Sequence, residues 1–241
     1  MKRTLKKTLC AALAMLLLCA FLPLFTTAHA LSQREAILLI AAQELGYHEK
    51  ANNTQLNSKT ANSGSRNYTK YGKWYGMNPA AWCAIFVCWC ANQSGLSEKA
   101  FPRFALCIDD TYPTSGSKQY KDMGRWMESD YAPQPGDLIF LAHGHVGLVE
   151  SVTDTEIVSI DGNWGDSVQR VSRSRSDADI AGFGLPLYDD TVLIDPETLP
   201  PAVDEEDPAP ETQSSGSKLS FSFFRQIIDW FRNLFAKLLG R

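Results

Sequence analysis

Residues 82–90 read Trp-Cys-Ala-Ile-Phe-Val-Cys-Trp-Cys, a run without one charged side chain. Asn78-Pro79 stands before the run, and a polar segment that ends at Gly95 follows it. Asn and Pro are common where helices begin and Gly is common where they end, so these flanks predict a helix. Because a helix that is apolar all round has no face for solvent, we expect it to lie in the core of the fold.

The cysteines of this segment differ in their position along the predicted helix. A cysteine in an apolar helix is usually a small buried hydrophobe, and we expect Cys88, Cys90 and the later Cys107 to be reduced, buried thiols. Cys83 stands near the N-terminal end, where free N–H groups and the helix dipole stabilise a thiolate, the form of cysteine that attacks carbonyl carbon. This argument requires a helix that begins close to Cys83 rather than at Asn78, because the dipole acts over the first turn.

The first thirty residues have the pattern of a secretory signal peptide. Four basic residues stand at the start, an apolar run covers residues 9–22, and Ala28-His29-Ala30 offers small residues at a cleavage site. We therefore expect cleavage after Ala30 and export of the mature chain; an uncleaved membrane anchor fits less well because the apolar run is short. Cleavage removes four positive charges and no acidic residue, which takes the formal net charge from −4 to −8. A chain this acidic is not expected to bind nucleic acid.

The remaining chain divides by composition into three parts. Residues 31–188 carry most of the aromatic side chains and all remaining cysteines, and they predict one globular domain. Residues 189–218 contain nine acidic residues and five prolines, a composition that buries too little apolar surface to fold, and we interpret them as a disordered linker. Residues 219–241 have an apolar face opposite a basic one, which predicts an amphipathic helix for a membrane surface or a partner's groove. Docking of this helix on the globular domain, or self-association, is the alternative.

Helical signals come first in the globular part. Ser32 and Glu35 form a capping-box pattern ahead of an apolar helical repeat that ends at Gly46. Residues 47–76 show no sustained periodicity and predict a long loop, whose aromatic side chains either line a groove or pack in the ordinary way. A further short helix is expected over residues 118–127.

Strand signals follow. Alternating patterns and turn residues predict strands over residues 138–141, 145–152, 156–161, 168–171 and 183–188. Helices followed by hairpin-linked strands are typical of an α+β domain with an antiparallel sheet.

A cysteine nucleophile needs a base, and His145 is the best placed of the four histidines. His29 leaves with the signal peptide and His48 lies in the polar loop, whereas His143 and His145 stand at the start of a predicted strand. Side chains two apart on a strand share a face, so this pair also suits two ligands of a zinc ion. No third ligand lies at a zinc-like spacing, and we expect neither a metal nor another cofactor.

A catalytic imidazole needs an acceptor that orients it, and the next predicted strand ends in Asp161-Gly162-Asn163. A hairpin that turns near residues 153–155 brings this end beside His145. Asp161 and Asn163 share one face by the strand period of two, and the register leaves open which of them contacts His145. Taken alone, Asp-Gly-Asn also suits an ordinary turn.

Four motifs follow one another in a recognisable order: Trp-Cys-Ala-Ile-Phe-Val at 82–87, Pro-Gly-Asp-Leu-Ile-Phe at 135–140, His-Val-Gly-Leu-Val-Glu at 145–150 and Ile-Asp-Gly-Asn at 160–163. Together they resemble the CHAP family, the cysteine, histidine-dependent amidohydrolases/peptidases. The similarity covers approximately residues 32–188. It implies a papain-like fold, with N-terminal helices packed on an antiparallel sheet and a nucleophilic cysteine at a helix N-terminus against the strand that bears the histidine.

The resemblance also implies a site and a reaction. Carried over by motif, Cys83 is the nucleophile and His145 the base. Asp161 holds the position where the family usually has Glu, and Asn163 that of its accompanying Asn, so the shorter Asp leaves open which of them orients His145. The implied reaction is hydrolysis of amide bonds in peptidoglycan, at the sugar-to-L-alanine amide or within the peptides.

The sequence therefore predicts an exported cysteine amidase or endopeptidase of the cell wall that uses Cys83, His145 and Asp161 or Asn163. Its C-terminal helix suits peripheral contact with the membrane and attachment to the cell envelope. The alternative is a non-catalytic wall-binding protein that keeps a degenerate papain-like fold. An unreactive Cys83 would favour this alternative.

We predict that the secreted protein begins at Leu31, so that N-terminal sequencing reads Leu-Ser-Gln. The matched variant Ala28→Lys places a long charged side chain where the cleavage site needs a small one, and it should leave the precursor uncut. Recovery of the extracellular protein with Met1 still attached would contradict this cleavage site.

Overall fold

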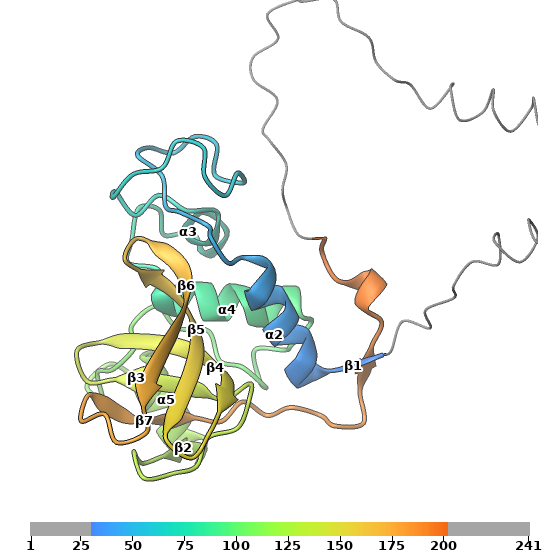
Figure 1. Cartoon of the computed structure of the whole chain (residues 1–241), viewed down its shortest axis with the longest axis vertical. Helices are drawn as coiled ribbons and strands as arrows, with labels where there is room; N and C mark the ends of the chain where they lie inside the picture. Colours follow the sequence, from blue (N-terminus) through green and yellow to red (C-terminus); the bar gives the residue numbers. More distant parts are fainter. Residues whose placement is uncertain (1–29, 202–241) are drawn as a thin grey trace, which may run out of the picture. The chain divides into compact units, whose positions relative to one another are not determined.

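The computed structural model describes residues 30–201, drawn in colour in Figure 1. All but the last residue of the predicted signal peptide, the predicted amphipathic helix 219–241 and most of the predicted linker lie outside these described residues. Within residues 30–201, no helix is long and apolar enough to cross a membrane.

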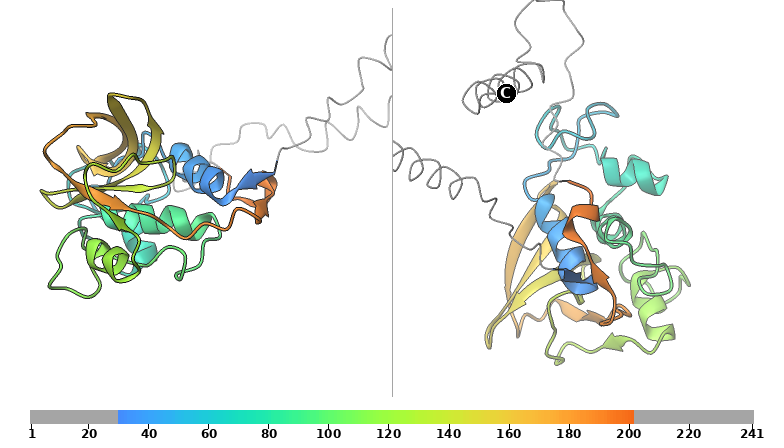
Figure 2. Two further views of the ribbon diagram at one scale, coloured as in Figure 1. Left: turned by 90° about the horizontal axis from the view of Figure 1, so that it is seen from below. Right: turned by 90° about the vertical axis from the view of Figure 1, so that its right-hand side faces the viewer.

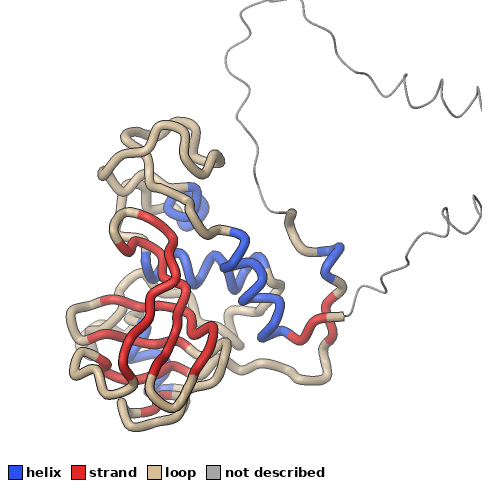
Figure 3. Tube along the Cα trace, viewed as in Figure 1, coloured by secondary structure: helices blue, strands red, loops and turns tan. Residues whose placement is uncertain are grey.

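The described chain is an α+β domain, as the sequence predicts. Its helices are α2 (Gln33–Gln43), α3 (Lys70–Tyr75), α4 (Cys83–Gln93), α5 (Gly116–Asp122) and the 3₁₀ helix η1 (Pro196–Thr198). Its strands are β1 (Leu31–Ser32), β2 (Trp126–Met127), β3 (Leu138–Leu141), β4 (His145–Val152), β5 (Glu156–Trp164), β6 (Ser167–Ser174), β7 (Ile180–Gly184) and β8 (Leu193–Ile194). Six strands form one antiparallel sheet in the order β2-β7-β3-β4-β5-β6, and Figure 3 colours the strands red and the helices blue.

Helix α4 is the apolar helix expected from residues 82–90. It begins at Cys83, with Trp82 as its N-cap, so the cysteine stands at the very start of the helix. Asn78 does not cap α4, because its side-chain oxygen accepts a hydrogen bond from the Thr69 backbone N–H at 3.0 Å. After the last turn, Gly95 takes a positive φ of 79° that turns the chain away.

Helix α4 is covered on several sides, as its composition requires. It packs against β4 and β5 of the sheet and against helices α2 and α3, and the right-hand view in Figure 2 shows the strands on one side of the helices. The buried side chains of the sheet that share its core are Leu138, Phe140, Val146, Leu148, Ile160 and Val168. The main core of the domain therefore lies between α4 and one face of the sheet.

The opposite face of the sheet carries a second, smaller core. Its fully buried members include Ile139, Val149, Ile157 and Phe183, which alternate along their strands with residues of the main core. The same alternation puts His145 of β4 on the face of Val149. The strand pattern thus groups the histidine with the side chains of β5 that share this face.

Helix α3 is a difference from the sequence prediction, which assigned all of residues 47–76 to a loop. The Thr69 side chain accepts from the Gly72 N–H, and Gly76 ends the helix at a φ of 88°. A helix of six residues is too short to show a hydrophobic periodicity, so its two cap residues are the sequence features that indicate it. Tyr71 of this helix is fully buried, which makes it a packing residue.

The helix predicted over residues 118–127 is found earlier in the chain, as α5 (Gly116–Asp122). The Ser115 side chain caps α5 by accepting from the Lys118 N–H, and the chain leaves the helix through Gly124 with a φ of 64°. Residues 126–127 form β2 instead, because they pair with Phe183 and Gly184 of β7. Strand β7 itself occupies residues 180–184 rather than the expected 183–188.

The folded domain also extends beyond its predicted end at residue 188. Leu193 and Ile194 form β8, which pairs antiparallel with Ser32 and Leu31 of β1. The Asp189 backbone N–H donates to the Gln33 side chain at 2.8 Å. The assignment of residues 189–201 to a disordered linker is therefore wrong. Leu193 and Ile194 form a strand although the segment around them is mostly acidic and rich in proline.

Strand β5 approaches α4 so closely that Gly162 has no room for a side chain. A Cβ atom placed there would lie 2.5 Å from Cβ of Phe86. We predict that Gly162→Ala lowers the free energy of unfolding by about 1–3 kcal/mol, because the helix and sheet must move apart to admit the methyl group. Denaturant unfolding measures this change.

The control for Gly162→Ala is Ser172→Ala, at an exposed position of β6, which should change stability by no more than about 0.5 kcal/mol. Equal unfolding midpoints for the two variants would contradict the close contact between β5 and α4.

Candidate active site

Cys83 lies at the N-terminus of α4 with only 8% of its surface exposed. Its Sγ atom is 3.5 Å from Sγ of Cys107, which belongs to the irregular segment between α4 and α5. All four cysteines of the described residues are buried free thiols, but only these two have sulfur atoms in contact. The expectation that Cys107 is an ordinary core thiol is therefore incomplete, because it borders the candidate nucleophile.

The surroundings of Cys83 favour its thiolate. The hydrogen bond with Cys107 lowers the pKa of the Cys83 thiol most, burial opposes this, and hydrogen bonding to His145 and the charge of His145 lower the pKa further. The net effect holds the pKa of Cys83 well below its usual value. In return, the hydrogen bond to Cys83 raises the pKa of Cys107, so Cys107 is the partner that keeps its proton.

His145 is the first residue of β4 and is 7% exposed. Its Nε2 atom lies 2.9 Å from Oδ2 of Asp161, which leaves Nδ1 as the ring nitrogen for the thiol. Burial lowers the pKa of His145, but the hydrogen bonds with Asp161 and Cys83 outweigh burial and raise the pKa to about 9. The lowered pKa of Cys83 and the raised pKa of His145 both favour a thiolate beside an imidazolium.

Asp161 is a fully buried carboxylate that contacts two cationic side chains, His145 and Arg173. Oδ2 accepts the hydrogen bond from His145 and another from Nη2 of Arg173 at 2.5 Å, while Nη1 of Arg173 donates to Oγ of Ser159 at 2.6 Å. Burial raises the pKa of Asp161, and the His145 hydrogen bond together with the Arg173 charge overcomes it, so the pKa falls below its usual value. Because a buried charge is costly without partners, Arg173 makes an ionised Asp161 possible at this depth.

The backbone of β4 makes room for Asp161. A Cβ atom at Gly147 would lie 2.0 Å from Oδ1 of Asp161 and 3.1 Å from Oγ of Ser159. Oδ1 is buried and has no hydrogen-bond partner among the residues that the structure describes. The carboxylate therefore fills the space above Gly147 and directs Oδ2 to its two cations.

Asn163 does not contact His145. The pairing of β5 with β6 shifts register between Asp161 and Trp164, and Asn163 takes a left-handed φ of 60° that asparagine tolerates better than most residues. Its Nδ2 atom lies 3.4 Å from Oδ1 of Asn67. Of the two acceptors that the sequence left open, the structure thus brings Asp161 to the histidine.

His143 stands beside His145 but in a different environment. Their rings lie 5.9 Å apart, and His143 is exposed, with Nδ1 at 2.5 Å from Oδ2 of Asp179. Each histidine thus pairs with its own carboxylate, His145 with Asp161 and His143 with Asp179. Within residues 30–201, no three His, Cys, Asp or Glu side chains are grouped so as to hold a metal ion.

Comparison with protein families gives an independent result. The family model for the CHAP domain matches residues 74–163. This part of the chain therefore matches the family that the four sequence motifs resemble. CHAP domains are generally hydrolases that act on peptidoglycan. No match was found among curated proteins or among solved structures.

The CHAP match includes Cys83, His145, Asp161 and Asn163 but ends before Arg173. The sequence alone does not reveal this arginine, because the expected strand ends at residue 171 and nothing distinguishes Arg173 from Arg170 in a polar stretch. The structure separates them: Arg170 pairs with Glu150 on the exposed side, whereas Arg173 is 7% exposed.

Trp164 is a further neighbour of the site that the motifs do not reveal. Its ring lies edge-on to His145 at 5.2 Å, and the Arg173 guanidinium carbon lies 4.8 Å from its centroid. A half-buried indole at this place shields the His145–Asp161–Arg173 row from solvent and strengthens the interactions within it.

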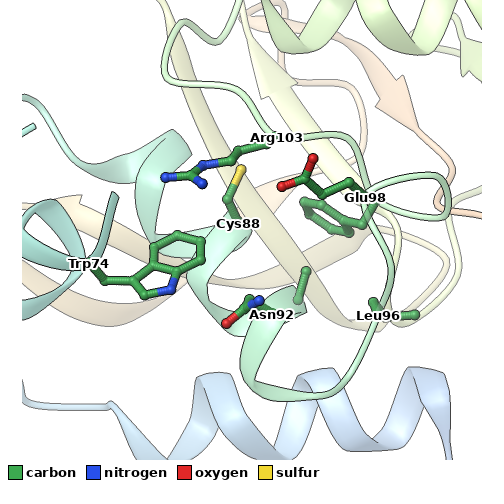
Figure 4. A pocket seen from close by; sticks show the side chains of 8 residues that line it. Trp74, Cys88, Asn92, Leu96, Glu98 and Arg103 are labelled. Carbon is green, nitrogen blue, oxygen red and sulfur yellow. The ribbon is translucent and has the colours of Figure 1, made fainter. Parts of the chain in front are cut away.

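A pocket lies elsewhere on the domain, beside the C-terminal half of α4. Figure 4 shows it lined by Trp74, Cys88, Asn92, Leu96, Glu98 and Arg103. It contains neither Cys83 nor His145. Trp74 is thus the aromatic residue of the predicted loop that borders a hollow, while its neighbours on α3 contribute to packing.

We predict that Asp161→Asn moves the alkaline limb of the pH profile of kcat/KM to lower pH. The limb should follow the pKa of His145, about 9, because the imidazolium must supply a proton to the leaving group. Asp161 raises that pKa through a hydrogen bond and a negative charge, so its neutralisation lowers the pKa and activity is lost at a less alkaline pH. Initial rates at low substrate concentration across the pH range measure the shift.

The matched control is Asn163→Ala, which removes the other candidate acceptor. Its alkaline limb should stay in place, because Asn163 contacts Asn67 rather than His145. A limb that moves with Asn163→Ala and not with Asp161→Asn would reverse the assignment.

Proposed function

We propose that the protein is an exported cysteine amidase or endopeptidase that hydrolyses amide bonds in peptidoglycan. The observation that carries the proposal is the row Cys83–His145–Asp161, in which a thiol at a helix start meets an imidazole held by a buried carboxylate. This is the arrangement that an activated nucleophile needs: a thiolate, a proton donor beside it and a group that fixes the ring of that donor.

The first half of the reaction forms an acyl-enzyme. The Cys83 thiolate attacks the amide carbonyl carbon, a bond forms between Sγ and that carbon, and the carbonyl oxygen takes the negative charge. The first N–H groups of a helix have no carbonyl acceptor within the helix, so the Cys83 N–H is available to the oxyanion. As the tetrahedral intermediate collapses, the carbon–nitrogen bond breaks and His145 transfers its proton to the leaving amine.

The second half returns the enzyme to its starting state. His145, now neutral, takes a proton from water while the water oxygen attacks the thioester carbon. Collapse of this second intermediate breaks the carbon–sulfur bond and releases a carboxylic acid. The Cys83 thiolate and the His145 imidazolium are restored, and Asp161 holds the ring in one orientation throughout.

The CHAP match supports peptidoglycan as the substrate class. Export follows from the signal-peptide pattern of residues 1–30, and it would bring the protein to the compartment that contains this polymer. The choice between the sugar-to-L-alanine amide and a peptide bond of the stem or cross-bridge depends on substrate contacts beyond the catalytic residues. Product analysis makes this choice.

The alternative function is a non-catalytic wall-binding protein with the same fold. The buried charges argue against it, because Asp161 and Arg173 stay in the interior only as a pair, and such pairs rarely add stability over apolar side chains of similar size. A fold that had lost its chemistry would have no physical reason to keep a buried carboxylate aimed at a histidine.

We predict that Cys83→Ala and His145→Ala each lower the rate of peptidoglycan hydrolysis by about a thousandfold or more, since neither the nucleophile nor the proton donor has a substitute. The Asp161→Ala loss should be smaller, because water can take part of its orienting role. His143→Ala is the matched control for His145→Ala: its ring is exposed and paired with Asp179, so it should keep most of the activity.

The measurement is digestion of purified peptidoglycan, with products separated and identified by mass spectrometry. Free amines should appear at one type of bond with the wild-type protein and be absent with Cys83→Ala. An inactive wild-type protein that still binds peptidoglycan would favour the wall-binding alternative.

A further inference from the structure

The proposed nucleophile has a second thiol as its nearest sulfur neighbour. Cys83 and Cys107 are 8% and 6% exposed, and their Sγ atoms are 3.5 Å apart. A disulfide bond is about 2.05 Å long, so the two atoms need to approach each other by roughly 1.5 Å. Cys107 lies outside helices and strands, and its segment is tied to α5 by hydrogen bonds from the Gly116 and Ser117 N–H groups to the Leu106 and Cys107 carbonyls.

We propose that Cys83 and Cys107 form a site of reversible oxidative modification. A small-molecule disulfide converts the two thiols into an intramolecular disulfide that stops hydrolysis, and a small thiol restores them. The loss of hydrolysis rests on the proposed function, whereas the formation of the disulfide does not.

The chemistry is two successive thiol–disulfide exchanges. The Cys83 thiolate attacks one sulfur of the small disulfide, whose sulfur–sulfur bond breaks, and one small thiolate leaves with the electron pair. Cys107 then loses its proton and attacks Sγ of Cys83, the mixed disulfide breaks, and the second small thiolate leaves. Both protein sulfur atoms are oxidised, and the small disulfide is reduced to one thiolate and one thiol, the latter bearing the proton from Cys107.

The first exchange makes the second one easier. The pKa of Cys107 is raised chiefly by its hydrogen bond to the Cys83 thiolate, with burial and the charge of Cys83 as further causes. When Cys83 is capped by a small thiol it no longer carries a charge, so two of these causes disappear. Burial still raises the pKa of Cys107, but without the Cys83 thiolate Cys107 ionises more readily and can act as the resolving thiol.

The other two cysteines of α4 do not share this position. Sγ of Cys88 lies 3.3 Å from the Phe104 carbonyl oxygen at the pocket of Figure 4, and burial raises the pKa of Cys88 to about 12. Cys90 is fully buried, and burial raises its pKa well above the usual value. Oxidation should therefore be selective for the pair at the N-terminus of α4.

The test uses the purified secreted protein, incubated with oxidised glutathione, quenched in acid and alkylated. We expect its mass before alkylation to fall by two hydrogen atoms, two fewer thiols to be alkylated, peptide mapping to join Cys83 to Cys107, and hydrolysis to fall to the level of Cys83→Ala. Reduced glutathione should then restore both the mass and the activity. The matched control Cys88→Ala removes a thiol of the same helix, and it should still form the bond.

Cys107→Ser separates this inference from simple capping of the nucleophile. Without a resolving thiol, the variant should accumulate the mixed disulfide of Cys83 with glutathione, seen as an added mass. Wild-type protein that stops at that same mixed disulfide, or that shows no mass change while it loses activity, would overturn the proposal. If the wild-type protein forms the Cys83–Cys107 bond but hydrolyses nothing even when reduced, the modification site stands and the proposed function fails.

Discussion

The burial of the first turns of α4, from Cys83 to Cys88, is the constraint on which the rest of the domain depends. A helix without polar side chains along its first two turns must be covered on all sides, and α2, α3, β4 and β5 supply that cover. The cover is tight: β5 comes so near that position 162 admits only glycine. This contact fixes the N-terminus of α4 against the end of the sheet, and it therefore fixes where Cys83 can meet a side chain from β4.

The chemistry of the site follows from placing charges in that tightly packed region. An imidazolium and a carboxylate away from water are stable only with partners, and the row from Cys83 through His145 and Asp161 to Arg173 alternates negative and positive groups. Each member stabilises the charged form of the next. Gly147 contributes by leaving space for the Asp161 carboxylate, so the backbone of the sheet is as much part of the site as the side chains are.

Local patterns in the sequence predicted the elements whose signals lie within a few residues: the apolar helix, the strands at residues 138–141 and 145–152, and the capping box of α2. These local patterns failed where a residue far away in the sequence determines the conformation. Strand β2 exists because Trp126 and Met127 pair with β7, and Asp161 rather than Asn163 meets His145 because a register shift turns Asn163 toward Asn67. Arg173 and Cys107 could not be predicted, since each gains its role from a residue more than ten positions away.

The same environment that activates Cys83 also exposes it to oxidation. The thiolate is the form of cysteine that attacks an amide, and it is also the form that attacks small disulfides and peroxides, so charges that favour the first reaction favour the second as well. A lone thiolate in an oxidising compartment risks passing from sulfenic to sulfinic acid, which is irreversible for most proteins. A protonated thiol at 3.5 Å changes this outcome, because it hydrogen-bonds the thiolate in the reduced state and offers a bond partner once Cys83 is oxidised. In the proposed reaction, Cys107 thus contributes to the low pKa of Cys83 and, by the disulfide proposed above, to protection of Cys83 against further oxidation.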